Sequence, residues 1–182
     1  LGLDYEHNTK DAEQNMVMSG MNVFMTYLWP GVETEKLGLF FEKDLNNISY
    51  GLRYDQVELN PTRAADDPGS GMMQKTANEV YTADYDGTIV ASKRDFDNIS
   101  GFLRLRTDLF HGESYINFSI NERAPDATEL FHAKNNSTAM MRHVGNPNLS
   151  SERHMTLEFG YEGMLLGNHI TGSIFYNEVD DY

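Results

Sequence analysis

Side chains that could bind a soft metal ion are concentrated in a few stretches of the sequence. Nine of the ten Met residues lie in or beside three long polar segments, at positions 16, 18, 21, 25, 72, 73, 140, 141 and 155. The third segment also holds three His residues. Thioethers select copper over hard cations, and imidazole joins them readily. We therefore hypothesise a copper site formed by Met16, Met18, His132, Met140, Met141, His143, His154 and Met155.

A structural role for the same Met residues is the alternative. Met commonly fills irregular gaps in a core, so these side chains could instead pack one loop against another or against a neighbouring domain. Met16 and Met18 are separated by one residue, so both side chains face the same way if the segment is extended. The residue types alone leave both interpretations open.

Other kinds of chemistry find little support in the sequence. The chain has no Cys, which excludes a disulfide framework and thiolate metal ligands. A formal net charge of −14 argues against a nucleic-acid partner, because little here would neutralise phosphates. No nucleophile elbow, HExxH motif or phosphate-binding Gly loop occurs, and the adjacent pairs Asp66-Asp67 and Asp180-Asp181 are typical of solvated surface. We expect no enzyme and no certain cofactor, with copper as a possible ligand.

The strands that must position these residues are predicted from a regular alternation of apolar and polar residues. Apolar and polar residues alternate in seven windows, which predicts two-faced strands at 1–9, 35–44, 48–59, 99–109, 114–122, 155–162 and 169–177. One face should carry Leu52, Leu103, Leu105, Ile116, Phe118, Leu157, Phe159 and Ile174. The other should carry Arg53, Arg104, Arg106, Asn117 and Glu158. The predicted fold is an all-β, antiparallel up-and-down meander.

Connection lengths separate a membrane barrel from a soluble sandwich, which shows the same alternation. Tight turns are predicted at 44–47, 110–113 and 163–168, and long connections at 10–34, 60–98 and 123–154. Soluble domains rarely carry three such long loops, whereas outer-membrane barrels combine short periplasmic turns with long extracellular loops. The long segment 60–98 is acidic, as expected of a solvated loop or a funnel for cations. We therefore expect part of a large transmembrane β-barrel, with the lipid bilayer as a partner.

Motifs near the third loop point to a family. Arg123-Ala124-Pro125 ends a strand, since Pro cannot donate to a ladder, and residues 126–129 read as a capping box that opens a helical turn through Phe131. A turn signal, Gly145-Asn146-Pro147-Asn148-Leu149, and a Glu-containing strand start at Glu152 follow. This order resembles the barrel of TonB-dependent receptors, which share an Arg-Ala-Pro box and an Asn-Pro-x-Leu box. The matching motif residues are Arg123, Ala124, Pro125, Glu129, Asn146, Pro147, Leu149 and Glu152. The segments LGLFFEKDLNNISYGLRYDQVEL and SIFYNEVDDY also look like strands of that family.

The resemblance implies a receptor in the bacterial outer membrane that imports a scarce nutrient. Such a barrel has about 22 strands around a plugged lumen, and its plug engages the TonB energy-coupling protein. Residues 1–182 are expected to form a partial barrel domain of about seven strands, without the plug and C-terminal strands. The copper-receptor branch looks most similar. A haem receptor is an alternative because His132 and His143 lie between the two boxes, and a ferric-siderophore receptor is another. A passive porin or structural barrel is the alternative of a different class.

Overall fold

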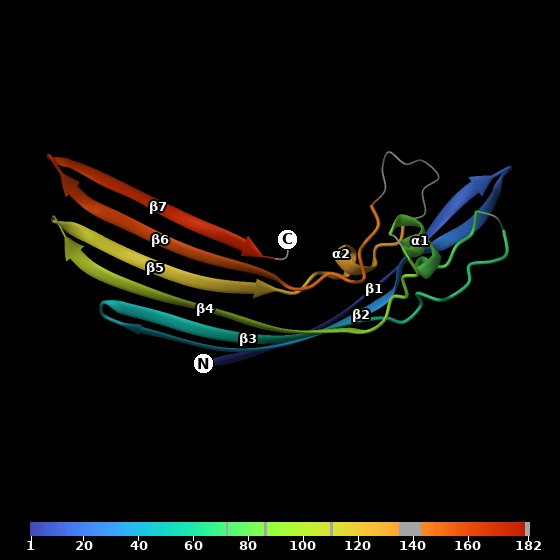
Figure 1. Ribbon diagram of the computed structural model, residues 1–182, viewed down its shortest axis with the longest axis horizontal. Coiled ribbons are helices and arrows are strands. Elements are labelled where there is room, and N and C mark those ends of the chain that lie inside the picture. Colours follow the sequence, from blue (N-terminus) through green and yellow to red (C-terminus); the bar gives the residue numbers. More distant parts are fainter. Residues whose placement is uncertain (72, 86, 110, 135–142, 181–182) are drawn as a thin grey trace.

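The computed structural model describes residues 1–71, 73–85, 87–109, 111–134 and 143–180, which form one long curved sheet (Figure 1). Its seven antiparallel strands follow chain order, so every neighbour in the sheet is also a neighbour in sequence. The strands are β1 (Gly2–Met18), β2 (Met21–Leu45), β3 (Ile48–Pro61), β4 (Arg94–Leu109), β5 (Gly112–Arg123), β6 (Glu152–Leu165) and β7 (Asn168–Asp180). The predicted all-β antiparallel meander is confirmed, and its curvature makes it a half-barrel.

The two ends of the sheet differ in their connections. At one end, here called the turn end, short turns join β2 to β3, β4 to β5 and β6 to β7. The other end, called the loop end, carries the two long connections between β3 and β4 and between β5 and β6. These hold two short helices, α1 (Ala77–Asp84) and α2 (Ala127–Phe131). Neither helix is long and apolar enough to cross a membrane, as far as the described residues go.

One predicted connection is wrong. Residues 10–34 form no loop, because β1 and β2 continue past the other strands as a hairpin that closes at Ser19 and Gly20. Both turn residues have positive φ, at 50° and 80°, which is the type I′ geometry favoured in two-residue hairpins. Register shifts near Ala12 and Gln14 interrupt the alternation of faces, so the period of two is lost from the sequence although the strands persist.

The predicted distribution of side chains over the two faces is confirmed by the register. Leu103 lies opposite Phe118, which lies opposite Leu157, while Arg104 and Asn117 pair on the reverse side. The face with the apolar residues, called the outer face, is solvent-exposed: Leu52 is 61% exposed and Ile174 is 71% exposed. Soluble proteins rarely expose an apolar patch of this extent.

Glycines opposite aromatic rings fix the register on the reverse side, called the inner face. Gly2 pairs with Phe40, Gly51 with Phe102 and Gly160 with Tyr115. In each pair the ring lies over the glycine, so that a Cβ on Gly51 would come within 2.6 Å of the Phe102 ring. A slip of the register by one residue would set a side chain against each ring, and the aromatic rings therefore stabilise one pairing.

Among the described residues, the two clusters of buried apolar side chains both lie at the loop end. The helix α2 packs on the inner face through Leu130 and Phe131, which contact Val32, Leu59 and neighbouring apolar residues. A second cluster joins α1 to the chain after α2, through Tyr81 and Ala133. The loops therefore form a packed cap on the inner face of β2, β3 and β4.

Candidate functional site at the loop end

The candidate site is built on the short helix α2. Asp126 caps the helix, because its side chain accepts hydrogen bonds from the backbone N–H groups of Thr128 and Glu129. Glu129 in turn accepts the backbone N–H of Asp126 at 2.8 Å, which completes the predicted capping box. Pro125 is buried immediately before the cap. The capping box therefore sets the residue at which α2 begins, shortly after the end of β5.

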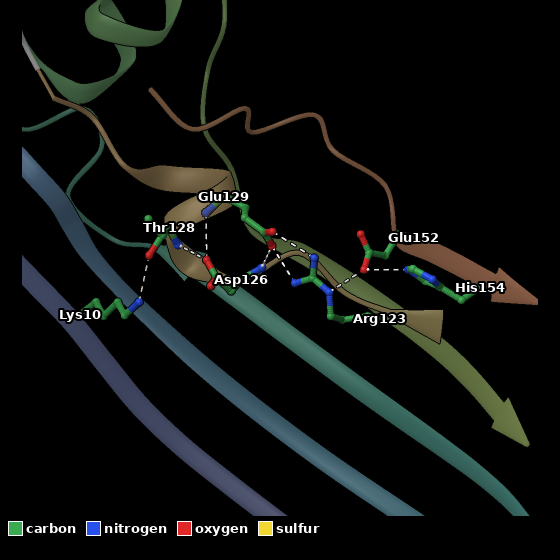
Figure 2. A network of polar contacts seen from close by, with 7 residues as sticks. All are labelled: Lys10, Arg123, Asp126, Thr128, Glu129, Glu152 and His154. Atoms are coloured by element: carbon green, nitrogen blue, oxygen red, sulfur yellow. Dashed lines mark hydrogen bonds and ion pairs between the residues drawn. The ribbon is translucent and has the colours of Figure 1, made fainter. Parts of the chain in front are cut away.

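Arg123 connects this helix to two strands (Figure 2). Its guanidinium donates to both carboxylate oxygens of Glu129, at 2.9 and 3.0 Å, and its Nε donates to Glu152 at 2.9 Å. Because the guanidinium of Arg123 and the backbone N–H of Asp126 both favour the carboxylate, they hold the pKa of Glu129 below its usual range. Arg123 therefore clamps the end of β5, the start of β6 and α2 together.

The second motif closes against the first. The backbone N–H of Asn146 donates to the carbonyl of Glu129 at 2.8 Å, and Gly145 donates to His132. Gly145 must lack a side chain, since a Cβ there would lie 2.7 Å from the Leu130 backbone. Arg94 of β4 donates to the carbonyl groups of Pro147 and Leu149, and Leu149 packs on the same apolar cluster as Leu130. The motif residues are therefore brought together in space around α2.

His132 is held in a single tautomer just after α2. Its Nδ1 lies 2.6 Å from the carbonyl oxygen of His143, and a carbonyl can only accept, so Nδ1 carries the proton. The Nε2 lone pair is then available, which is the arrangement typical of a metal-binding imidazole. The Trp29 ring lies 4.9 Å away. Burial is the main cause that lowers the pKa of His132, and the positive charge of Lys134 adds to it, so the imidazole stays neutral near pH 7.

The other candidate ligands are more dispersed. Met16 and Met18 share one side of β1 near the hairpin tip, beyond Ala12, which is opposite Trp29. At about 3.3 Å per residue, Met16 is roughly 13 Å along the strand from that position. His143 is exposed, and His154 lies on the inner face 3.3 Å from Glu152. Met155 lies on the outer face, opposite Ile120. Met140 and Met141 lie outside the described residues.

Residues that the motifs do not reveal also contribute to the site. Lys10 of β1 donates to Thr128 of α2 at 3.0 Å, which connects the hairpin to the helix (Figure 2). The Lys10 ammonium also lies over the Trp29 ring. Lys10 and Trp29 belong to the segment predicted as a loop, and only its identity as a hairpin brings them to α2. Within the described part of the chain, no three His, Asp or Glu side chains gather closely enough to hold a metal ion.

Comparisons with known proteins agree with this fold. The family model described as TonB dependent receptor-like, beta-barrel, matches residues 1–182. A solved structure titled "Copper transporter OprC" superposes with a TM-score of 0.66 at 20% sequence identity, covering 100% of this chain and 27% of that chain. At that identity the likeness shows the fold. No curated protein matches the sequence. The chain thus spans about a quarter of the length of the solved transporter.

Proposed function

The chain belongs to the TonB-dependent receptor family, and on that premise we propose that it forms part of the wall of an outer-membrane receptor that imports copper. The exposed apolar outer face supports a membrane location, because lipid would cover it. In this proposal the loop end faces the outside of the cell and the turn end faces the periplasm. The energy for import comes from the TonB protein, which acts through a plug inside the barrel.

The observation that carries the copper proposal is the fixed imidazole of His132. Its proton is on Nδ1 and its Nε2 is available, so it needs no rearrangement to bind a metal ion. The hairpin with Met16 and Met18 is joined to α2 by Lys10, which puts thioethers on an element anchored to the same helix. We propose that Met140, Met141, His143 and His154 complete the soft ligand set, and that Met155 packs with the outer face.

Copper binding by the full-length receptor tests this proposal. Met140→Leu and Met141→Leu together keep the side-chain volume and remove both sulfurs, and His132→Gln removes the imidazole. We expect each change to weaken copper binding at least tenfold, measured by competition with a chelator. Met164→Leu, at the turn end, is the matched control and should leave affinity unchanged. Equal copper affinity in all four proteins would contradict the assignment.

Haem is the second candidate, since the same imidazole lies beside an aromatic ring, the arrangement in which a flat porphyrin could bind. Titration of the receptor with haem distinguishes the haem candidate from the copper candidate. A haem absorption spectrum with an axial His, lost in His132→Gln, together with copper binding that is unaffected by the Met140 and Met141 changes, would favour haem over copper.

A further inference from the structure

A groove of about 250 Å³ lies on the outer face of the sheet near the turn end. It occurs where a row of small side chains runs across the strands between larger ones. Its lining comes from three strands and includes Leu105, Thr107 and Leu109 of β4, Ser114 and Ile116 of β5, and Phe159 of β6. We call these six residues and the space between them the outer-face groove.

The strand register explains the depth of the groove. Leu105 lies opposite Ile116, which lies opposite Phe159, and this row forms one wall. In the next row toward the turns, Thr107 lies opposite Ser114. Ser114 is 2% exposed, whereas Leu105 and Ile116 are 45% and 49% exposed. The hydroxyl side chains therefore form a floor between taller apolar neighbours.

Tyr161 marks the turn side of the groove. It lies opposite Ser114, but its ring extends over two glycines nearer the turns. A Cβ on Gly163 would come within 2.6 Å of the Tyr161 hydroxyl, and a Cβ on Gly112 within 2.9 Å of the ring. Tyr is enriched where the apolar part of a membrane meets water. The groove therefore lies on the apolar side of that boundary.

We propose that the outer-face groove binds an acyl chain of one phospholipid, more tightly than the surrounding lipid is held. The proposal rests on the membrane location proposed above, in which the turn end faces the periplasm and so lies in the leaflet made of phospholipid. The groove is continuous with the exposed apolar outer face, so the lipid that covers this face reaches it. A chain in the groove contacts both walls and the floor, and dispersion attraction grows with the number of such contacts.

Binding of a single lipid to the full-length receptor tests the proposal. The receptor is delipidated and titrated with dioleoyl phosphatidylethanolamine, and native mass spectrometry counts the lipids bound. We expect one lipid to bind before any other. Thr107→Phe fills the groove from an exposed position and should weaken this first step at least tenfold. Thr9→Phe makes the same exchange at an exposed position of β1 and should leave it unchanged. Equal binding by the two variants would overturn the proposal.

The lipid that stays on the receptor after mild detergent extraction identifies the occupant. A phospholipid mass is expected on the unmodified receptor and on Thr9→Phe, and should be lost from Thr107→Phe. A lipid A mass, or no retained lipid, would overturn the assignment. Fractionation of the cell envelope tests the membrane location separately. A receptor found in the outer membrane without a retained lipid would refute the groove alone, and a receptor absent from that membrane would refute the proposed location as well.

Discussion

The turn end and the loop end of the sheet are stabilised in different ways. At the turn end the strands have one layer, with apolar side chains exposed on the outer face. The inner face there carries polar side chains and the rings of Phe40, Phe102 and Tyr115. At the loop end α2 and the following chain cover the inner face and bury Leu130 and Phe131 completely. The first region therefore depends on backbone pairing and, in the proposed membrane location, on lipid. The second depends on a core like that of a soluble protein. The candidate site around α2 lies where the second kind of packing holds the loops in place.

The largest difference in stability is expected between the alanine variants of two leucines, one at each kind of region. Leu130→Ala removes a side chain that is 0% exposed, and should cost about 2–5 kcal/mol. Leu52→Ala removes one that is 61% exposed on the outer face, and should cost far less. Hydrogen exchange of the full-length receptor in lipid vesicles measures both, as loss of protection in α2 and in β3. Equal losses would mean that the two regions share one kind of packing.

A charge on the outer face tests whether lipid covers it. Leu103→Arg places a guanidinium in the middle of the apolar band, which should destabilise the barrel by about 2–4 kcal/mol in a bilayer. Val90→Arg, at a 66% exposed position between α1 and β4, should change stability by less than about 0.5 kcal/mol. The midpoint of unfolding in urea, with vesicles present, is the measurement. A tolerated Leu103→Arg would contradict the assignment of this face to lipid.

A glycine substitution tests how the single-layer region keeps its register. A Cβ on Gly160 would collide with the Tyr115 ring, whereas a Cβ on Gly172 meets nothing within 4 Å. Gly160→Ala should therefore destabilise by about 1–3 kcal/mol. Gly172→Ala should be neutral or slightly stabilising, because it reduces the freedom of the unfolded chain. Thermal unfolding of the two variants, compared side by side, provides the test; the reverse order would exclude the proposed role of the ring.

The clamp formed by Arg123 should contribute a smaller amount to the loop end. Arg123→Lys keeps the charge but cannot bond Glu129 with a planar fork and reach Glu152 as well. The side chain is 48% exposed, which limits the effect to about 1–2 kcal/mol. A double-mutant cycle with Glu129→Gln measures the coupling through protease cleavage of the connection between β5 and β6. Additive effects of the two changes would show that the ion pair does not hold α2.

Acid should loosen the same helix, as the smallest of these effects. Because the folded pKa of Glu129 lies below its usual 4.5, the ionised side chain stabilises the loop end above pH 4.5. That contribution is lost as the pH falls through the lowered pKa. Hydrogen exchange of the α2 amides between pH 3 and 6 should show the loss, and Glu129→Gln should remove it. An unchanged pH profile in Glu129→Gln would assign the effect to another carboxylate.

The two regions also differ in how far their structure could be predicted from the sequence. In the single-layer region the pleat puts each residue on a known face, so Leu103 and Arg104 could be assigned without a structure. At the loop end, local chemistry predicted α2, since Asp126 and Glu129 form a capping box. The same spacing at Thr76 and Glu79 caps α1, which is absent from the predicted elements. Sequence spacing therefore reports local structure well where each residue has one environment.

Long-range contacts at the loop end could not be predicted in this way. Residues 10–34 were expected to form a loop, and the bulges near Ala12 hide the hairpin that brings Lys10 to Thr128 across 118 positions of sequence. The bond from Arg94 to Pro147 likewise depends on how separate elements pack. So does the burial of the Asn98 Oδ1, which has no hydrogen-bond partner in the described part of the chain. His132 and Trp29 are brought together by the same packing, and this packing produces no periodic pattern in the sequence from which it could be predicted.

The strictly sequential strand order has a consequence for the time course of assembly. Every strand pairs with the one made just before it, so no pairing has to wait for a distant part of the chain. Two of the turns, at Ser19-Gly20 and Leu166-Gly167, already have the left-handed backbone of a type I′ turn, which favours closing of each hairpin before its neighbours join. Isolated hairpins form within about 1–10 μs. The wall can therefore grow one hairpin at a time along the chain, and α2 can pack on the inner face only after β2, β3 and β4 have paired.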